Sequence, residues 1–213
     1  MRVGELLTPM VVVMRRELVG SSYIQADETP VDVQMHHGRG QNHQAYLWQY
    51  SRPGGSAVFD FRLGRGRHGP KQFLGPFEGI LQSDGYTAYE HVGGPKMVHA
   101  ARHALRLEQA RPLLDIIHQE IERARAHALP SRALGNLAEN SMRPVALGRK
   151  NWIHIGSPQA GPKVAAILSI VESCRRLKIP VRDYLAAVLP GLAGTSIQKL
   201  AELTPTAWAA KNQ

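Results

Sequence analysis

Three acidic residues in the sequence have side chains suited to binding a metal ion. Asp27 lies in Tyr-Ile-Gln-Ala-Asp-Glu-Thr-Pro, Asp84 in Ile-Leu-Gln-Ser-Asp-Gly-Tyr, and Glu139 in Asn-Leu-Ala-Glu-Asn-Ser-Met-Arg-Pro. Hard cations such as Mg²⁺ prefer oxygen ligands, and a two-metal centre needs carboxylates that converge from separate elements. In a basic chain, the three residues predict a metal centre for phosphoryl transfer on nucleic acid.

The elements around these residues can bring them together. Residues 23–26 and 80–83 are short apolar stretches typical of buried strands, and they directly precede Asp27 and Asp84. If the two strands are neighbours, both carboxylates reach a common point. Glu139 then has to arrive from a helix packed against the edge of the sheet.

Each carboxylate also has a structural interpretation that the sequence leaves open. Asp27 can be a turn residue, and Glu28 is equally available as a ligand. Asp84-Gly85 is a common turn dipeptide. Asn136 and Glu139 have the spacing of a helix cap and its reciprocal partner. Each signal is weak alone, and the three gain weight together with their basic surroundings.

Hydrophobic periodicity predicts an α/β protein with one main domain. The expected order is a helix at 4–19, strands at 23–26, 45–50 and 57–62, a short helix at 71–74, strands at 80–83 and 96–99, and then helices. We expect a core at 1–155, with a shortened helical insertion at about 103–130, and a helical C-terminal region at 156–213. Helices are expected there at 164–177, 181–189 and 197–203, with frayed residues at 209–213.

The charge of the chain favours a polyanionic partner. Among 213 residues, 26 Lys and Arg exceed 17 Asp and Glu, which gives a net charge of +9 and an isoelectric point near 10.0. Net charge indicates attraction to polyanions and says nothing about the fold. The alternative to a nucleic-acid-binding protein is a basic protein that is merely soluble.

Two cationic clusters could hold a phosphodiester backbone. The first contains Arg62, Arg65, Arg67, His68 and Lys71, and the second contains Arg143, Arg149 and Lys150, followed by Trp152. Neutralised phosphates would make binding strongly dependent on salt. A solvated basic loop, with the tryptophan in the core, is the structural alternative for the second cluster.

Cysteine content and hydropathy point to a soluble cytoplasmic protein. Cys174 is the sole cysteine, which excludes an intrachain disulfide and fits a reducing compartment. The apolar stretch at 10–14 is far shorter than a membrane span and has charged flanks. We therefore expect no membrane partner.

Other catalytic chemistries have little support in the sequence. His36, His37 and His43 lie in or beside a Gly-rich segment without a Cys pair, so a tetrahedral zinc site is not expected. Ser83 and Cys174 have no evident base partner. A Gly-rich phosphate loop followed by Lys-Ser or Lys-Thr is missing from the sequence.

Several longer stretches carry a resemblance to a known family. They are Tyr-Ile-Gln-Ala-Asp-Glu-Thr-Pro-Val at 23–31, Ala-Tyr-Leu-Trp at 45–48, Leu-Gln-Ser-Asp-Gly-Tyr at 81–86, and Ala-Glu-Asn-Ser-Met-Arg-Pro-Val-Ala-Leu-Gly-Arg-Lys-Asn-Trp at 138–152. These stretches, and the segment from Gly156 to about Trp208, resemble insertion-sequence-66-type transposases of bacteria. The last motif is long enough to be highly specific.

The resemblance implies a fold, a reaction and a cofactor. The fold is a ribonuclease-H-like mixed sheet flanked by helices, and the reaction cuts and joins DNA strands with Mg²⁺ or Mn²⁺. Asp27 and Asp84 match the two catalytic, metal-binding aspartates of the family, and Glu139 matches its glutamate.

The resemblance also implies partners. Arg143, Arg149 and Lys150 match the basic motif of the family and are expected to hold DNA, both transposon ends and target. Other transposase subunits or accessory proteins of the element are further expected partners. The implied location is the bacterial cytoplasm, in association with the nucleoid.

The chain departs from the family pattern in two places. Full-length relatives begin with further N-terminal regions thought to recognise transposon ends, whereas this chain starts just before the catalytic strands. Between Asp84 and Glu139, relatives carry a Cys-Trp-x-His-Ala-Arg-Arg motif and a longer helical insertion. Here the chain runs His99-Ala-Ala-Arg-His-Ala-Leu-Arg and resembles an internally deleted copy.

The sequence therefore leaves three functions open. The first is a transposase catalytic domain. The second is an inactive, internally deleted remnant that only binds DNA or intact transposase. The third, a general ribonuclease-H-like nuclease, ranks last because the motif around Glu139 is closer to that of the transposases.

Overall fold

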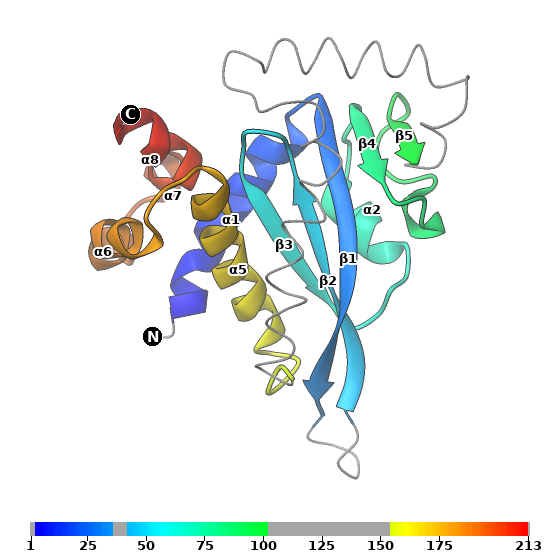
Figure 1. Cartoon of the computed structure of the whole chain (residues 1–213), viewed down its shortest axis with the longest axis horizontal. Coiled ribbons are helices and arrows are strands. Elements are labelled where there is room, and N and C mark those ends of the chain that lie inside the picture. The colour runs from blue at the N-terminus through cyan, green and yellow to red at the C-terminus, as the bar shows by residue number, and fades with distance from the viewer. Residues whose placement is uncertain (1–2, 36–41, 102–153, 213) are drawn as a thin grey trace.

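The computed structural model describes residues 3–35, 42–101 and 154–212 (Figure 1). The insertion predicted at about 103–130 lies outside the described residues. So do four residues predicted to bind metal or DNA, which are Glu139, Arg143, Arg149 and Lys150.

The centre of the molecule is a five-stranded mixed sheet with the strand order β3-β2-β1-β4-β5. The strands are β1 (Tyr23–Gln34), β2 (Asn42–Ser51), β3 (Ala57–Arg62), β4 (Ile80–Ser83) and β5 (Val98–Ala101). The first three pair antiparallel, and β4 is parallel to both β1 and β5. This confirms the α/β prediction, and the arrangement is compatible with a ribonuclease-H-like sheet.

Strand β1 is much longer than predicted. Residues 23–26 were expected as the strand, yet β1 continues through Asp27 and Pro30 to Gln34. Along its second half Val31 and Val33 are buried while the residues after each of them are exposed, which is the period of a half-buried strand. Asp27 is therefore a residue within a strand, and its interpretation as a turn residue is wrong.

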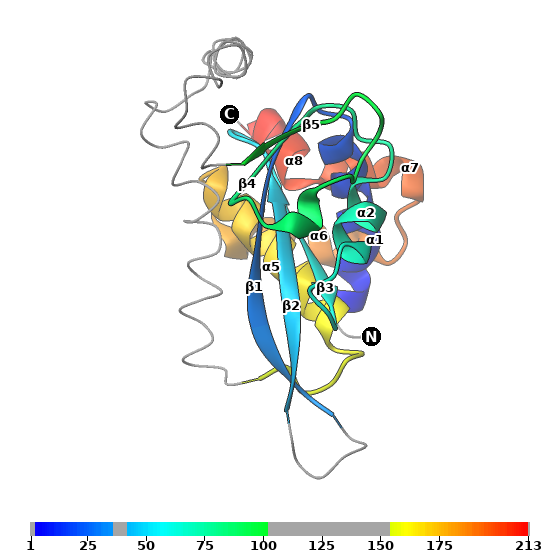
Figure 2. The ribbon, with the colours of Figure 1, turned by 90° about the vertical axis from the view of Figure 1, so that its right-hand side faces the viewer.

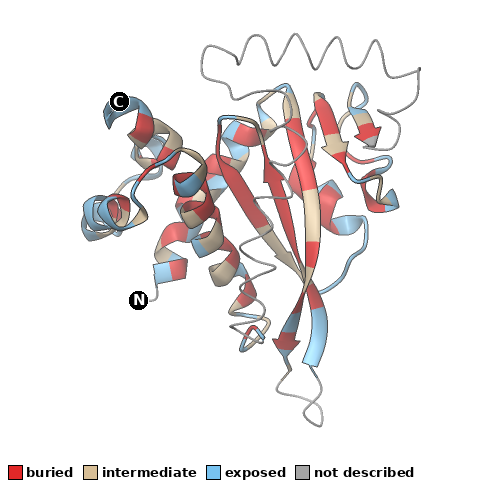
Figure 3. Cartoon of the chain, viewed as in Figure 1, coloured by how far each residue is buried: buried red, intermediate tan, exposed pale blue. Residues whose placement is uncertain are grey.

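The β1–β2 hairpin extends beyond the rest of the sheet as a two-stranded ribbon (Figure 1). Its pairing continues to Gln34 opposite Asn42, and burial falls toward the tip (Figure 3). The other hairpin, β2–β3, turns at residues 52–55 as predicted, with Gly54 at φ 65°. Only a residue without a Cβ adopts that φ at no steric cost.

Two long helices cover the β3 side of the sheet (Figure 2). Helix α1 (Val3–Val19) confirms the predicted helix at 4–19 and buries Leu7, Met10, Met14 and Leu18 at helical spacing. Helix α5 (Gly161–Arg176) packs against both α1 and β3. A Cβ on Gly4 would lie 2.7 Å from the backbone oxygen of Lys163, so this glycine permits the close approach of the two helices.

Helix α5 also covers the open edge of the sheet. The Oγ of Ser169 accepts the backbone N–H of Phe59 at 2.8 Å, and the Oγ of Ser173 accepts the N–H of Ala57 at 3.0 Å. Ser173 donates its hydroxyl proton to the carbonyl of Ala57, also at 3.0 Å. Because an edge strand exposes unpaired backbone groups, these serines replace the missing neighbour strand.

The C-terminal helices form a cluster beyond α1 (Figure 1). They are α6 (Val181–Leu192), α7 (Ile197–Leu200) with a 3₁₀ turn at Ala201–Leu203, and α8 (Pro205–Asn212). Tyr184 donates a hydrogen bond to the carbonyl of Leu203 at 2.6 Å and contacts the Trp208 ring edge-on at 5.9 Å. The expected fraying from 209 is wrong, because Ala209 is buried and α8 continues to Asn212.

One hydrophobic core joins the two regions that the sequence predicts. It contains Met10 and Leu18 of α1, Ile24 and Leu81 of the sheet, and Tyr184 of α6. The boundary between residues 155 and 156 stays a prediction. Within the described ranges, no helix is long and apolar enough to cross a bilayer.

Candidate functional site

The sheet topology places Asp27 in β1 and Asp84 directly after the end of the adjacent parallel strand β4. Strands β1 and β4 pair residue by residue, and the last pair is Gln25 with Gln82. Continued by two residues, the same register would bring Asp84 level with Asp27, and neighbouring strands lie about 4.8 Å apart. The condition that the sequence left open, that these two strands are neighbours, is met.

Strand alternation places Asp27 on the same face of the sheet as Gln25 and Gln82. Gln25 and Gln82 share that face, because the Nε2 of Gln25 donates to the Oε1 of Gln82 at 3.1 Å. Tyr23 also donates a hydrogen bond to Gln82. Since side chains alternate between faces with a period of two, Asp27 continues this polar row, and Asp84 follows Gln82 by two residues, in the turn after β4.

Local backbone groups orient both carboxylates. The Oδ1 of Asp84 accepts the N–H of Tyr86 at 3.0 Å, and Gly85 between them has φ 96°. The Oδ1 of Asp27 accepts the N–H of Glu28 at 2.9 Å. Asp84 is exposed and Asp27 half-buried, so the turn at Asp84-Gly85 is real and presents the carboxylate to solvent.

Gln49 is a further polar residue beside this pair, and no sequence signal singles it out. It lies directly across from Asp27 in the β1–β2 ladder and is fully buried. Neither atom of its amide has a hydrogen-bond partner in the part of the chain that the structure describes. An unpaired buried amide is costly, so Gln49 is an unsatisfied polar group at the level of Asp27.

Glu28, the alternative ligand to Asp27, lies toward the opposite face. Its side chain is 1% exposed, and its Oε1 lies 2.7 Å from the Nη2 of Arg65. Its Oε2 accepts the hydroxyl of Tyr89 at 2.9 Å. Both carboxylate oxygens are therefore occupied, which leaves Asp27 as the better candidate ligand.

The first cationic cluster is only partly available to a phosphate. Arg65 is held by Glu28, and its guanidinium lies over the ring of Tyr86 at 4.0 Å, although 46% of its side chain is exposed. Its hydrogen bond to Glu28 raises the pKa of Arg65. Arg67 and Lys71 are exposed beside it, at the N-cap and within helix α2 (His68–Leu74).

Ser83 has a base partner that the sequence does not reveal. The Nε2 of His99 on β5 lies 2.8 Å from its Oγ, so the prediction that no base is near is wrong. Ser83 is nevertheless 2% exposed, and its Oγ also accepts the N–H of Gly85 at 3.1 Å. A buried hydroxyl already bound to backbone is poorly placed for nucleophilic attack on a substrate.

The donor chemistry of the site fits a hard cation. Asp27 and Asp84 supply oxygen ligands, which Mg²⁺ and Mn²⁺ prefer. Within residues 3–35, 42–101 and 154–212, no group of three or more His, Cys, Asp or Glu could hold a metal ion. The third predicted ligand, Glu139, lies outside these ranges.

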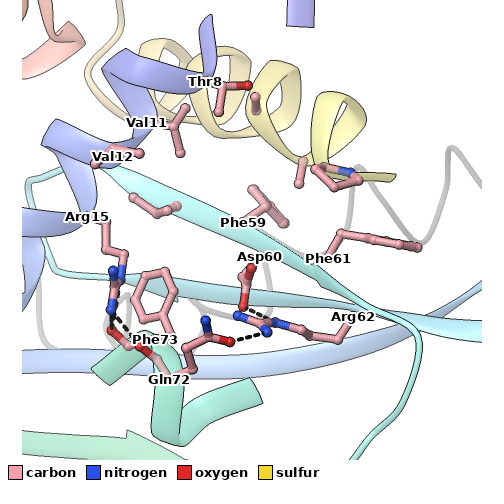
Figure 4. A pocket seen from close by; sticks show the side chains of 14 residues that line it. Thr8, Val11, Val12, Arg15, Phe59, Asp60, Phe61, Arg62, Gln72 and Phe73 are labelled. Atoms are coloured by element: carbon pink, nitrogen blue, oxygen red, sulfur yellow. Dashed lines mark hydrogen bonds and ion pairs between the residues drawn. The ribbon is translucent and has the colours of Figure 1, made fainter. Parts of the chain in front are cut away.

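A cavity of about 210 Å³ lies beside the edge strand β3, between this strand and α1, α2 and α5 (Figure 4). Asp60 lies at its polar side, 2.7 Å from Arg62. Asp60 pairs with Trp48 and Trp48 with Glu28 across the ladder, so all three side chains share the face opposite Asp27. The cavity is therefore separate from the aspartate pair.

Comparison with known proteins gives the chain a family. The family described as "Transposase IS66 family" matches residues 1–106, which contain β1 to β5 and both aspartates. No solved structure matches the chain significantly.

Two proteins of Sinorhizobium fredii are similar in sequence. The one named "Uncharacterized protein y4hP" is 29% identical over 133 residues, covering 50% of this chain and 24% of that protein. "Uncharacterized protein y4jD" is 35% identical over 77 residues, covering 35% of this chain and 15% of that protein. The matches therefore span about a quarter or less of these relatives. Through residues 1–106, the chain belongs to the IS66 family of transposases.

Proposed function

We propose that this chain is the catalytic domain of a DNA transposase, which cleaves and joins DNA phosphodiesters with Mg²⁺ or Mn²⁺. The observation that carries the proposal is the position of Asp27 and Asp84. Asp27 lies in β1 and Asp84 directly follows the adjacent parallel strand β4, and both are inside the segment that matches the transposase family. A two-metal phosphoryl transfer needs carboxylates from separate elements at one point.

In this proposal Asp27 and Asp84 hold the cation, and Glu139 is the third ligand. When bound, the metal supplies activation of water or a terminal 3′-hydroxyl and stabilisation of the leaving oxygen. The protein supplies position, because backbone N–H groups fix the Oδ1 atoms of both aspartates. The amide of Gln49, across the ladder from Asp27, is buried without a hydrogen-bond partner in the described part of the chain.

Cationic side chains from two segments are proposed to hold the DNA. Arg67 and Lys71 are exposed, and Arg65 keeps part of its guanidinium accessible above Tyr86. The second cluster, Arg143, Arg149 and Lys150, completes the proposed grip, which attracts the phosphate backbone without reading sequence. Transposon ends, target DNA and other subunits of the element are the proposed partners, in the bacterial cytoplasm.

A second candidate is a remnant that binds DNA or intact transposase without cutting. The shortened stretch between Asp84 and Glu139 favours it, because the family pattern has a longer helical insertion there. Metal-dependent activity separates the two candidates, since binding alone needs no cation at Asp27 and Asp84.

The test is nicking and joining of DNA by the purified chain. Supercoiled plasmid and an oligonucleotide with a free 3′-hydroxyl are incubated with Mg²⁺ or Mn²⁺. The proposal predicts nicked and joined products that Asp27→Asn and Asp84→Asn each abolish, with DNA affinity largely kept. The control is Asp32→Asn, an exposed aspartate on the same strand. An RNA–DNA hybrid is the substrate that a general nuclease would prefer.

Activity that survives in both variants contradicts the proposed site. Binding without any metal-dependent product, in the wild-type chain, supports the remnant. Products from the hybrid alone, without joining, support the nuclease.

A further inference from the structure

The edge strand β5 contacts the segment that carries Asp84 through one partly buried side-chain hydrogen bond. His99 pairs with Leu81 in the β4–β5 ladder, which places its ring on the same face as Ser83. The Nε2 of His99 lies 2.8 Å from the Oγ of Ser83, the residue directly before Asp84. This bond connects residues 16 positions apart and joins β5 to the end of β4.

The turn after β4 depends on that serine. The Oγ of Ser83 accepts the N–H of Gly85 at 3.1 Å, and the Oδ1 of Asp84 accepts the N–H of Tyr86 at 3.0 Å. The backbone at Gly85 has φ 96°, a conformation open to glycine. Two side-chain bonds therefore fix the direction in which Asp84 leaves the sheet.

Hydrogen-bond capacity assigns a role to the histidine. A serine hydroxyl has one proton to donate and two acceptor positions. The N–H of Gly85 uses one acceptor position of Ser83, which leaves the hydroxyl proton and the second acceptor position for the bond to the Nε2 of His99, and the tautomer of the ring decides which atom donates. Burial of His99 lowers its pKa, while the charges of Glu90 and Asp84 oppose that shift.

The surroundings also fix the ring. His99 is half-buried, and the ring of Tyr89 lies 6.2 Å from it at 45°. The hydroxyl of Tyr89 is itself bound to Glu28, the neighbour of Asp27. Tyr89 therefore contacts both the ring of His99 and the carboxylate of Glu28.

We propose that His99 is a positioning residue that acts through Ser83 to hold Asp84 in the orientation required for cation binding. The inference rests on the proposed function, since it presumes that Asp84 is a metal ligand. It adds β5 to the elements that form the site. Groups that orient a metal ligand from behind commonly change metal affinity by about 10-fold or more when removed.

The test measures Mn²⁺ affinity by electron paramagnetic resonance, without DNA. We expect Ser83→Ala and His99→Ala to weaken Mn²⁺ binding by about 10-fold. His99→Gln, whose amide can occupy the position of Nε2, should restore most of the affinity. His154→Gln, a change in an exposed histidine, is the control and should bind as the wild type does.

A second measurement needs neither metal nor activity. The backbone amide resonances of Gly85 and Tyr86 should shift in Ser83→Ala and in His99→Ala, and return toward the wild type in His99→Gln. Circular dichroism checks that each variant is folded.

The outcomes separate the inference from the function. If the wild type binds Mn²⁺ and the variants behave as expected while DNA stays uncut, the inference holds and the catalytic proposal fails. If Asp84→Asn loses Mn²⁺ and His99→Ala keeps wild-type affinity, the inference is overturned while the metal site stands. A wild-type chain without a specific Mn²⁺ site overturns both.

Discussion

The carboxylate of Glu28 lies 2.7 Å from the guanidinium of Arg65, on the face of β1 opposite to Asp27. Two consecutive acidic residues thus have separate surroundings. Glu28 is buried and bound on both oxygens, by Arg65 and Tyr89, whereas Asp27 is half-buried in the polar row with Gln25. Strand alternation alone produces this division, because neighbouring side chains lie on opposite faces.

Removing Arg65 should destabilise the fold. In Arg65→Ala the buried carboxylate of Glu28 keeps Tyr89 as its remaining described partner, and an unsatisfied buried group costs about 1–3 kcal/mol. We expect the lower part of that range, because water screens the half-exposed guanidinium. Urea unfolding measures the decrease in stability. Arg67→Ala, a change in an exposed neighbour, is the control.

A double variant checks the cause. Glu28→Gln with Arg65→Ala removes the buried charge together with its partner, so it should recover part of the lost stability. Equal decreases in the single and double variants would show that the ion pair is not the reason.

The exposed cations beside β3 should bind DNA. Arg67→Ala with Lys71→Ala should weaken binding to duplex DNA of any sequence. The slope of log affinity against log salt should become shallower by about 0.9 for each phosphate that is no longer neutralised. Fluorescence anisotropy at several salt concentrations measures both effects. Lys199→Ala, a change in an exposed lysine on α7, is the matched control, and an equal effect there would mean that net charge alone governs binding.

The two serines of α5, Ser169 and Ser173, should stabilise the fold by pairing the backbone groups at the edge of the sheet. Ser173→Ala leaves the N–H and the carbonyl of Ala57 without their partner, and Ser169→Ala does the same to the N–H of Phe59. Each buried group left unpaired costs about 1–3 kcal/mol, so Ser173→Ala should be the more damaging change.

Thermal unfolding of both variants, beside Ser196→Ala in an exposed position, tests this order. A wild-type melting temperature in Ser173→Ala would disprove the importance of the edge hydrogen bonds. Uncovered strand edges pair with other chains, so light scattering should also rise on heating.

Asp60 should contribute to stability in acid. Burial raises its pKa above the ordinary value of 3.8, and its hydrogen bond to Arg62 opposes the shift (Figure 4). A raised folded-state pKa means that the native state binds the proton more tightly than the unfolded state. The stabilisation is therefore complete below pH 3.8 and is lost as the pH rises through the folded-state pKa.

The comparison with Asp60→Asn isolates this effect. The stability of the wild type relative to the variant, from urea unfolding between about pH 3 and 7, should fall as the pH increases. A difference that is constant, or that grows with pH, would mean that Asp60 is not desolvated in solution.

The short strands could be predicted from local signals. Strands β3 and β4 begin and end where expected, because turn residues bound each of them, at 52–55 before β3 and at Asp84-Gly85 after β4. The same logic places Asp84 at the end of a strand. That β1 and β4 are neighbours could not be predicted, because local signals do not show which strands pair across the sheet.

Partners far apart in the sequence could not be predicted. The segment Asp27-Glu28-Thr29-Pro30 has the composition of a turn, yet it continues β1 because each of its residues pairs with a residue of β2. The partner of the Glu28 carboxylate, Arg65, lies 37 positions away in the sequence. The expected strand at 96–99 is observed at Val98–Ala101, which brings His99 level with Leu81. Hydrophobic periodicity predicts which residues of a strand lie on the same face. It does not predict the register in which two strands pair.

One cation shared between Asp27 and Asp84 is the central feature of the proposed site. Iron in place of Mg²⁺, with ascorbate and hydrogen peroxide, cleaves a protein backbone beside the bound ion, and the fragments can be sequenced. A shared cation predicts two cuts, one beside Asp27 and one beside Asp84, and Asp84→Asn should lose both. Cuts beside one aspartate alone, or only in other segments, would contradict it.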